Sequence, residues 1–169
     1  NGEILAMASK PDYDPNSPRE AKFEVYAKQL EKAEDVDQRS AIISKMWRNP
    51  SVNDIYEPGS TFKLITASAA LEEDKVFADE VFYDSGYVKI KDRTIRNWTS
   101  RPYGSLTFRK AVEESVNTVF VQVANRLGAE TFRKYIEAFG YGSKTGIEIP
   151  GEAEGIIYPL SKTGEVELA

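Results

Sequence analysis

The 169-residue sequence contains neither cysteine nor histidine. Without cysteine it can form no disulfide, no thiol nucleophile and no cysteine metal site. Without histidine it can form no Ser-His-Asp triad and no histidine-based metal site. If a serine of this chain acts as a nucleophile, its proton acceptor must therefore be a lysine, a carboxylate or a bound water.

The sequence also has no excess of positive charge and no long apolar run. Aspartate and glutamate outnumber lysine and arginine by 27 to 22, so the net charge is −5, which argues against nucleic acid as a partner. No apolar run reaches the roughly 18 residues of a membrane span. An export signal or membrane anchor would have to lie outside this sequence. The 41% hydrophobic content is ordinary for a globular domain, or part of one, that buries a core.

The apolar periodicity predicts mostly helices with a few short strands. Helices are predicted over residues 19–34, 38–48, 61–73, 106–114, 118–127 and 131–139. Thr107 is a plausible cap for the fourth of these helices, and Gly128 ends the fifth. Residues 100–105 are predicted to form a loop. A buried strand is predicted over residues 3–9, and one or two short strands within residues 82–95. Residues 143–159 are rich in glycine and proline and are predicted to form an extended loop with short strand pieces. Because a core strand opens the sequence with almost no lead-in, we expect the domain to be truncated there.

The segment from Tyr56 to Lys63 combines a turn with a helix start. Pro58 and Gly59 mark the turn, and Ser60 falls at the N-cap or in the first turn of the helix that follows. Lys63 lies one turn further along on the same face. A hydroxyl at a helix N-terminus lies where negative charge is stabilised, and a neutral lysine one turn away can take its proton. The same spacing also fits a serine that only caps a helix, followed by a solvated lysine.

The tripeptide Ser115-Val116-Asn117 lies between two predicted helices, where polar side chains can face a cleft. A second serine can shuttle a proton from Lys63 toward a leaving amine. Asn117 can hydrogen-bond a substrate amide and the lysine together. The alternative is an interruption between helices that is stabilised only by local side-chain hydrogen bonds.

In these segments the sequence resembles the transpeptidase domain of class B penicillin-binding proteins of the FtsI/SpoVD type. The ordered matches cover residues 2–9, 56–63, 85–87, 115–120, 139–147 and 150–152. The resemblance implies an α/β fold, that of the serine β-lactamases and penicillin-binding protein transpeptidases. In it, an antiparallel sheet is flanked by helices and adjoins a helical region. Residues 1–169 would then form a partial transpeptidase domain, truncated at both ends.

The resemblance also implies a chemistry, that of a peptidoglycan D,D-transpeptidase working through a serine acyl-enzyme. Ser60 would be the acylated nucleophile and Lys63 the base that activates it. Ser115 would be a further catalytic residue, and Asn117 would bind substrate. The substrates would be peptidoglycan stem peptides ending in D-Ala-D-Ala, and β-lactam antibiotics would acylate the same serine. No metal and no cofactor are implied.

The family's biology supplies further expectations. The protein would act at the extracytoplasmic face of the bacterial cell membrane, anchored by an N-terminal segment that is not in this chain. A membrane glycosyltransferase of the wall-synthesis machinery would be its partner, in cell division or in the maintenance of cell shape. Two alternatives stay open. One is a D,D-carboxypeptidase or β-lactamase of the same fold, and the other is a non-catalytic β-lactam sensor or scaffold.

The family carries a third element, Lys-Thr-Gly, on an edge strand. The sequence contains this string twice, at residues 144–146 and 162–164, and we expect neither to be the catalytic one. Lys144 follows Ser115 too closely. In the second string, Glu165 stands where the family usually has a hydroxyl residue, and Thr163 followed by acidic residues suits a helix start. We therefore expect this chain to lack the catalytic strand, and Lys162 to lie well away from the site.

Overall fold

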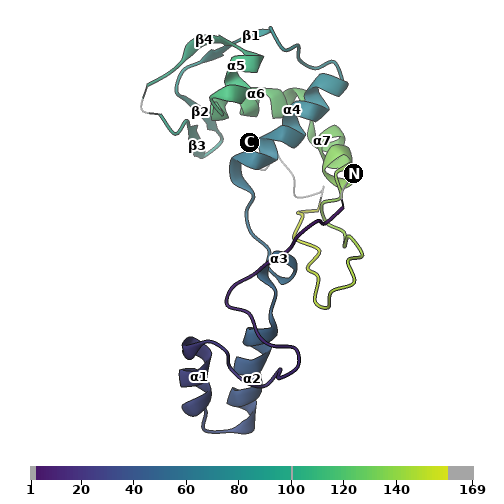
Figure 1. Cartoon of the computed structure of the whole chain (residues 1–169). Helices are drawn as coiled ribbons and strands as arrows, with labels where there is room; N and C mark the ends of the chain where they lie inside the picture. The colour runs from purple at the N-terminus through teal and green to yellow at the C-terminus, as the bar shows by residue number, and fades with distance from the viewer. Residues whose placement is uncertain (1–2, 100, 160–169) are drawn as a thin grey trace. The chain divides into compact units, whose positions relative to one another are not determined.

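A computed structural model of the chain describes residues 3–99 and 101–159 (Figure 1). These residues form two compact units. The first unit comprises residues 3–55 and 146–153, and the second comprises residues 56–99, 101–145 and 154–159. Among the helices of the described ranges, none combines the length and the apolar character needed to cross a lipid bilayer.

The first unit is built from three short helices, and side chains cap the starts of the second and the third. Its helices are α1 (Glu24–Glu31), α2 (Val36–Trp47) and α3 (Pro50–Asn53). Asp35 caps α2 by accepting a hydrogen bond of 2.7 Å from the backbone N–H of Gln38. Asn49 caps α3 in the same way through Ser51, and Pro50 takes the first helical position, where no N–H is needed. The two predicted helices are confirmed, with α1 shorter than expected.

The predicted buried strand over residues 3–9 is wrong. These residues form no strand, and Ile4 and Leu5 are 59% and 91% exposed. A strand needs a neighbour to pair its backbone N–H and C=O groups. Within the described parts of the chain, no segment pairs with this one. The apolar run was therefore a misleading signal.

Residues 146–153 complete the first unit. The side-chain amide of Asn53 donates to the carbonyl oxygens of Pro150 (3.1 Å) and Gly151 (2.8 Å). The backbone N–H of Ala153 donates to Val52 at 3.1 Å. The loop predicted over residues 143–159 is confirmed in its described extent, but it contains none of the expected strand pieces.

The second unit holds most of the helical elements and all of the strands seen in the described residues. In chain order its helical elements are the 3₁₀ turn η1 (Gly59–Phe62), α4 (Lys63–Glu72), α5 (Phe108–Glu113), α6 (Asn117–Leu127) and α7 (Ala129–Ala138). Gly128 separates α6 from α7 with a φ of +74°, which glycine adopts without the penalty of a side chain. The helices predicted after Ser60 and on either side of residue 128 are confirmed.

The strands of the second unit form two small antiparallel sheets. They are β1 (Val81–Asp84), β2 (Tyr87–Ile90), β3 (Arg93–Arg96) and β4 (Gly104–Thr107). β1 pairs with β4, so that Asp84 lies opposite Gly104, and β2 pairs with β3. The sequence had predicted a loop and a helix start where β4 lies. The helix α5 begins only at Phe108, with Thr107 as its expected cap, accepting from Lys110 at 3.2 Å.

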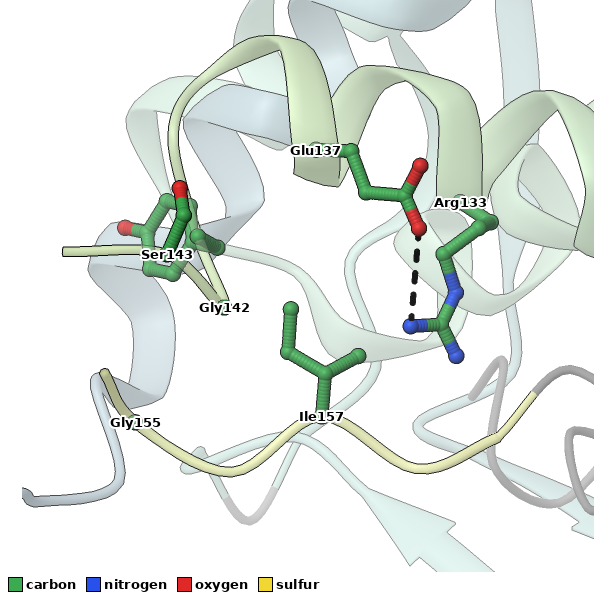
Figure 2. A pocket seen from close by; sticks show the side chains of 7 residues that line it. Arg133, Glu137, Gly142, Ser143, Gly155 and Ile157 are labelled. Atoms are coloured by element: carbon green, nitrogen blue, oxygen red, sulfur yellow. Dashed lines mark ion pairs between the residues drawn. The ribbon is translucent and has the colours of Figure 1, made fainter.

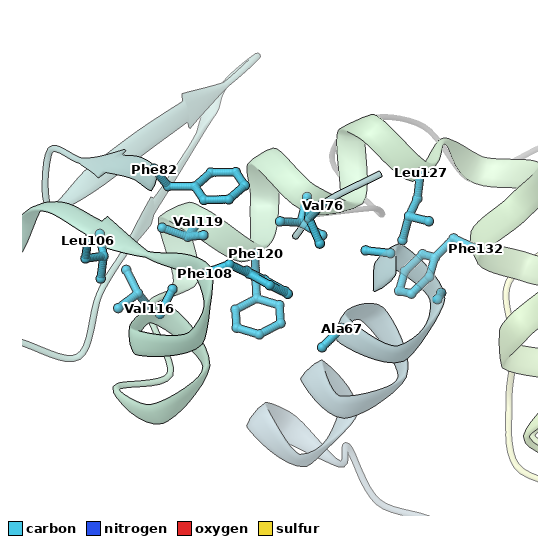
Figure 3. Packing of buried hydrophobic residues seen from close by; sticks show 14 residues of the cluster. Ala67, Val76, Phe82, Leu106, Phe108, Val116, Val119, Phe120, Leu127 and Phe132 are labelled. Atoms are coloured by element: carbon cyan, nitrogen blue, oxygen red, sulfur yellow. The ribbon is translucent and has the colours of Figure 1, made fainter. Parts of the chain in front are cut away.

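One hydrophobic core joins these elements (Figure 3). Its buried side chains come from α4, the strands β1 and β4, and the helices α5 to α7. Three of its rings pack in series, Phe82 against Phe108 and Phe108 against Phe120. The cluster consists of Ala67, Ala69, Ala70, Val76, Phe82, Leu106, Phe108, Ala111, Val116, Val119, Phe120, Val123, Leu127 and Phe132. α6 supplies four of these residues, so the core fixes the helix that begins at Asn117 against the helix that begins at Lys63.

Candidate active site

Lys63, Ser115 and Asn117 come together in the second unit. The Lys63 ammonium donates to the carbonyl oxygen of Ser115 at 2.7 Å and to the Ser115 hydroxyl at 2.8 Å. It also donates to the side-chain oxygen of Asn117 in a short hydrogen bond. An ammonium has three N–H donors, so these acceptors satisfy it completely. Residues more than 50 positions apart in the sequence thus form one cluster.

Ser60 lies in η1, one turn before Lys63. In a 3₁₀ turn the side chains at positions i and i+3 lie directly above one another, so the spacing predicted to put Ser60 and Lys63 on one face is realised. Ser60 is exposed, and its hydroxyl has no hydrogen-bond partner within the described residues. Lys63 is half-buried and points its nitrogen toward residues 115 to 117. The nucleophile candidate is therefore open to a ligand, while the lysine is held.

The environment of Lys63 acts on its proton in two opposing ways. Burial lowers the pKa of Lys63 below the usual lysine value, because an ammonium loses hydration there. The Phe120 ring, whose centroid lies 5.3 Å from the nitrogen, favours the charged form through its π face. No role was predicted for Phe120, although it lies at helical spacing from Asn117. The net direction is downward, which is the direction a lysine base requires.

Ser115 owes its position to the way α5 ends. The backbone N–H of Val116 donates to Ala111 (2.9 Å) and that of Ser115 donates to Val112 (3.1 Å). This pair of hydrogen bonds defines a Schellman helix end. In that motif the first residue after the helix cap has a left-handed backbone conformation and is usually glycine. Here Ser115 takes that conformation with φ +55°. Strained backbone conformations cluster at functional sites, so this conformation supports a functional role for the Ser115 side chain.

Asn117 is oriented by a second contact. Its side-chain NH₂ group donates to the carbonyl oxygen of Arg96, at the end of β3, over 2.7 Å. The amide oxygen is therefore the atom that faces Lys63. Because the acceptor is a backbone carbonyl, no sequence pattern could have identified Arg96 as a neighbour of the site.

The Lys-Thr-Gly strings do not enter this cluster in the described part of the chain. Residues 143–147 form no strand, and Lys144 is exposed and makes no hydrogen bond to Ser60 or Ser115. Lys162, Thr163 and Glu165 lie outside the described residues. The expectation that neither string is the catalytic one stays a prediction.

A hollow on the second unit lies apart from these residues (Figure 2). Arg133 and Glu137 of α7 face it with their charged groups 4.0 Å apart. On another side, Ile157 packs so closely on Gly142 that a Cβ there would come within 2.5 Å of its terminal methyl group. The hollow is lined by Arg133, Glu137, Tyr141, Gly142, Ser143, Gly155 and Ile157. It includes none of the four candidate site residues.

Comparison with known proteins identifies the family. The model of the penicillin-binding protein transpeptidase domain matches residues 1–167. The chain belongs to this family. The similar curated proteins include Stage V sporulation protein D of Bacillus subtilis, 42% identical over the whole chain and 23% of the relative's length. Peptidoglycan D,D-transpeptidase MrdA of Acinetobacter baumannii is 30% identical over 94% of the chain and 22% of its own length. The chain thus spans less than a quarter of these penicillin-binding protein relatives.

Solved structures of transpeptidase proteins show the same fold. Pseudomonas aeruginosa PBP2, solved in complex with WCK 5153, matches with a TM-score of 0.71 and 30% identity over 93% of this chain and 34% of its own. The D,D-transpeptidase domain of a peptidoglycan glycosyltransferase from Eggerthella lenta matches with a TM-score of 0.65 and 34% identity, over 85% of this chain and 31% of its own. The family and fold class expected from the sequence are confirmed. The expectation that residues 1–169 are a partial domain stays a prediction.

Proposed function

We propose that this chain carries the acyl-enzyme residues of a serine-type peptidoglycan D,D-transpeptidase. The supporting observation is the position of the Lys63 nitrogen. It lies within hydrogen-bond distance of Ser115 and Asn117, one 3₁₀ turn after an exposed serine. Family membership and a relative named as a D,D-transpeptidase agree with this assignment.

In the proposed reaction, Ser60 attacks the carbonyl carbon that joins the last two D-alanines of a stem peptide. Its proton passes to Lys63, and an ester forms between the serine oxygen and the penultimate D-alanine. The amide bond to the terminal D-alanine breaks. The nitrogen of the leaving D-alanine receives a proton from Lys63 through the Ser115 hydroxyl. An amine of a neighbouring stem then attacks the ester. Ser60 regains its proton and a new amide cross-link remains.

The proton transfer sets a condition on Lys63. With three acceptors around it the nitrogen fits an ammonium, yet only the neutral amine can accept the proton of Ser60. A neutral amine has two N–H donors, so one of the three contacts is released and its lone pair can turn toward Ser60. The burial that lowers the pKa of Lys63 makes the neutral form accessible. Asn117 then keeps one contact with the lysine and can bind the substrate amide.

For the whole protein we propose the setting expected of the family. It would be held by a membrane anchor at the extracytoplasmic face of the bacterial membrane and work beside a glycosyltransferase. The catalytic Lys-Thr-Gly would lie on a strand other than residues 144–146 and 162–164. Two alternative activities make different predictions. Fast hydrolysis of the acyl-enzyme would favour a carboxypeptidase or β-lactamase, and stable acylation without peptide turnover would favour a sensor or scaffold.

The proposal is tested on the intact protein with a stem peptide ending in D-Ala-D-Ala and an acceptor amine. We expect release of D-alanine and formation of a cross-linked product, and we expect both to vanish in Ser60→Ala. The matched control is Ser68→Ala. Ser68 is also exposed and lies on α4, which directly follows η1, but its hydroxyl donates to the carbonyl oxygen of Leu64. Ser68→Ala should keep wild-type turnover. Turnover by Ser60→Ala would contradict the proposal.

A further inference from the structure

We propose that Asp84 is a positioning residue for the reaction, because it holds the start of α6 and thereby the Ser115 and Asn117 side chains against Lys63. The inference rests on the proposed function. It adds three residues that lie behind the site, Asp84, Asn97 and Thr118, none of which would touch the substrate.

Asp84 is a fully buried carboxylate that is satisfied by neutral donors. It is 0% exposed. One oxygen accepts from the backbone N–H of Gly86 (2.8 Å) and the hydroxyl of Thr118 (2.5 Å). The other accepts from the backbone N–H of Tyr103 (2.7 Å) and the side-chain amide of Asn97 (2.9 Å). A single side chain thus connects the turn after β1, the segment after β3, the lead into β4 and the first turn of α6.

This carboxylate is costly to bury, so its presence in a core needs a reason. Among the described residues, no lysine or arginine forms an ion pair with it. Burial alone would raise the pKa of Asp84, but the hydrogen bonds from Thr118, Tyr103, Gly86 and Asn97 together hold it below the usual range. It therefore stays ionised. An apolar side chain could fill the space at lower cost, but it could not connect four segments in one fixed geometry.

The connection reaches the site through the N-terminus of α6. Val116 is at the N-cap of α6 and supplies no side-chain cap, so the first N–H groups of the helix need other acceptors. Asn97 provides one. Its amide oxygen accepts from the backbone N–H of Thr118 (3.3 Å) while its NH₂ group is held by Asp84.

A second contact joins the same two segments one residue earlier in each, between Arg96 and Asn117. The carbonyl of Arg96 accepts from the Asn117 side chain at 2.7 Å, which turns the amide oxygen of Asn117 to Lys63. Two neighbouring residues at the end of β3 therefore hold two neighbouring residues at the start of α6, and Figure 1 shows β3 beside this helix. Asp84 accepts hydrogen bonds from both Asn97 and Thr118 and so holds the two segments together.

Thr118 offers the sharpest test, because its hydroxyl can be removed without changing its shape. Thr118→Val keeps the volume and removes the bond to Asp84, while Thr118→Ser keeps the hydroxyl. The control is Leu127→Ala, which opens the core at the opposite end of the same helix, about 14 Å away at 1.5 Å per residue. Thr118→Ala removes the hydroxyl without placing a methyl group against the carboxylate, and it replaces the valine variant if that protein does not fold.

The measurement is acylation of the intact protein by a fluorescent penicillin, resolved into the initial binding constant and the first-order acylation rate. We expect Thr118→Val to slow the acylation step about tenfold, the effect of a modest loss of alignment, with initial binding unchanged. Thr118→Ser should stay close to the wild type. Leu127→Ala should lower the melting temperature at least as much as Thr118→Val does, yet acylate at the wild-type rate.

The outcomes separate the inference from the function on which it rests. If the valine and serine variants acylate at equal rates, or if Leu127→Ala is as slow as Thr118→Val, Asp84 and Thr118 only stabilise the fold and the positioning role is wrong. A wild-type protein that acquires no label overturns the proposed function itself, and the inference with it.

Discussion

The two segments that form the candidate site differ in how firmly they are held. The η1 turn presents Ser60 in an exposed position, with no hydrogen bond to its hydroxyl among the described residues. Residues 115 to 118 are fixed by a Schellman helix end, by the carbonyl of Arg96 and by the buried network of Asp84. One segment is open to a ligand, and the other is a rigid support.

Lys63 links the two segments. By sequence it belongs with Ser60, one turn earlier, but all three hydrogen bonds of its ammonium go to Ser115 and Asn117. The proposed base is therefore aligned by the segment that does not carry the nucleophile. Preorganisation of this kind lowers the cost of arranging the groups when the substrate arrives.

The largest effect is expected from replacing the amine of Lys63, the group that would have to accept the proton of Ser60. Lys63→Arg keeps a cation and several donors facing Ser115 and Asn117, but a guanidinium cannot lose its proton at any relevant pH. We expect Lys63→Arg and Lys63→Ala to lose acylation equally, by about 10³-fold or more, the scale of a lost general base. The measurement is the second-order rate constant of penicillin acylation.

This result has a clear opposite. An arginine variant that acylates near the wild-type rate would mean that Lys63 supplies only charge and donors. Ser60 would then need another proton acceptor, and the lowered pKa of Lys63 would have no role in the reaction.

A substitution at Asn117 tests the role of Lys63 through the pH dependence of acylation. Asn117→Asp places a carboxylate where the amide oxygen meets Lys63. A negative neighbour favours the ammonium and raises the pKa of Lys63. Since acylation needs the neutral amine, its rate should rise with pH through that pKa, and the rise should move to higher pH in the variant. We expect a loss of about 10- to 100-fold at neutral pH, corresponding to one to two pKa units.

The control for this shift is Asn117→Ala, which removes the contacts to Lys63 and to Arg96 without adding charge. The alanine variant should acylate more slowly than the wild type. Its rate should still rise with pH, over the same pH range as the wild-type rate. If the aspartate and alanine variants have the same pH profile, Lys63 is not the group whose ionisation limits acylation.

The sequence was informative where the signal is local. The spacing of Ser60 and Lys63 predicted a shared face, and a 3₁₀ turn produces it. Thr107 was recognised as a cap, and Gly128 as a helix end. Ser115-Val116-Asn117 was placed correctly between two helices, because residues on both sides have helical periodicity. These features depend on residues within one or two turns of each other.

The sequence failed where the partner is distant. β4 exists because residues 104–107 pair with β1, which lies at least 20 positions earlier. Four residues carry too little pattern to reveal this pairing. The run of Ile4 and Leu5 looked like a strand, yet no described segment pairs with it. Asp84 resembled any acidic residue before a turn, since its burial depends on donors from four segments.

The smallest effect is expected at the start of α5, and it tests whether this end of the helix contributes to the position of Ser115. Thr107→Ala removes the cap of α5, the helix whose far end carries Ser115. We expect a loss of stability of about 1 kcal/mol, the usual value of such a cap, seen as a lower melting temperature. The acylation rate should be unchanged, because the end of α5 is held separately. A slower acylation would show that the start of α5 also positions Ser115.

The central claim is that Ser60 is the residue that forms the acyl-enzyme, and the position of the adduct tests it most directly. The intact protein is treated with a penicillin and digested, and the modified peptide is sequenced by mass spectrometry. The account predicts the penicilloyl group on Ser60, and no adduct in Ser60→Ala. An adduct on Ser115, or on any other serine, would contradict it.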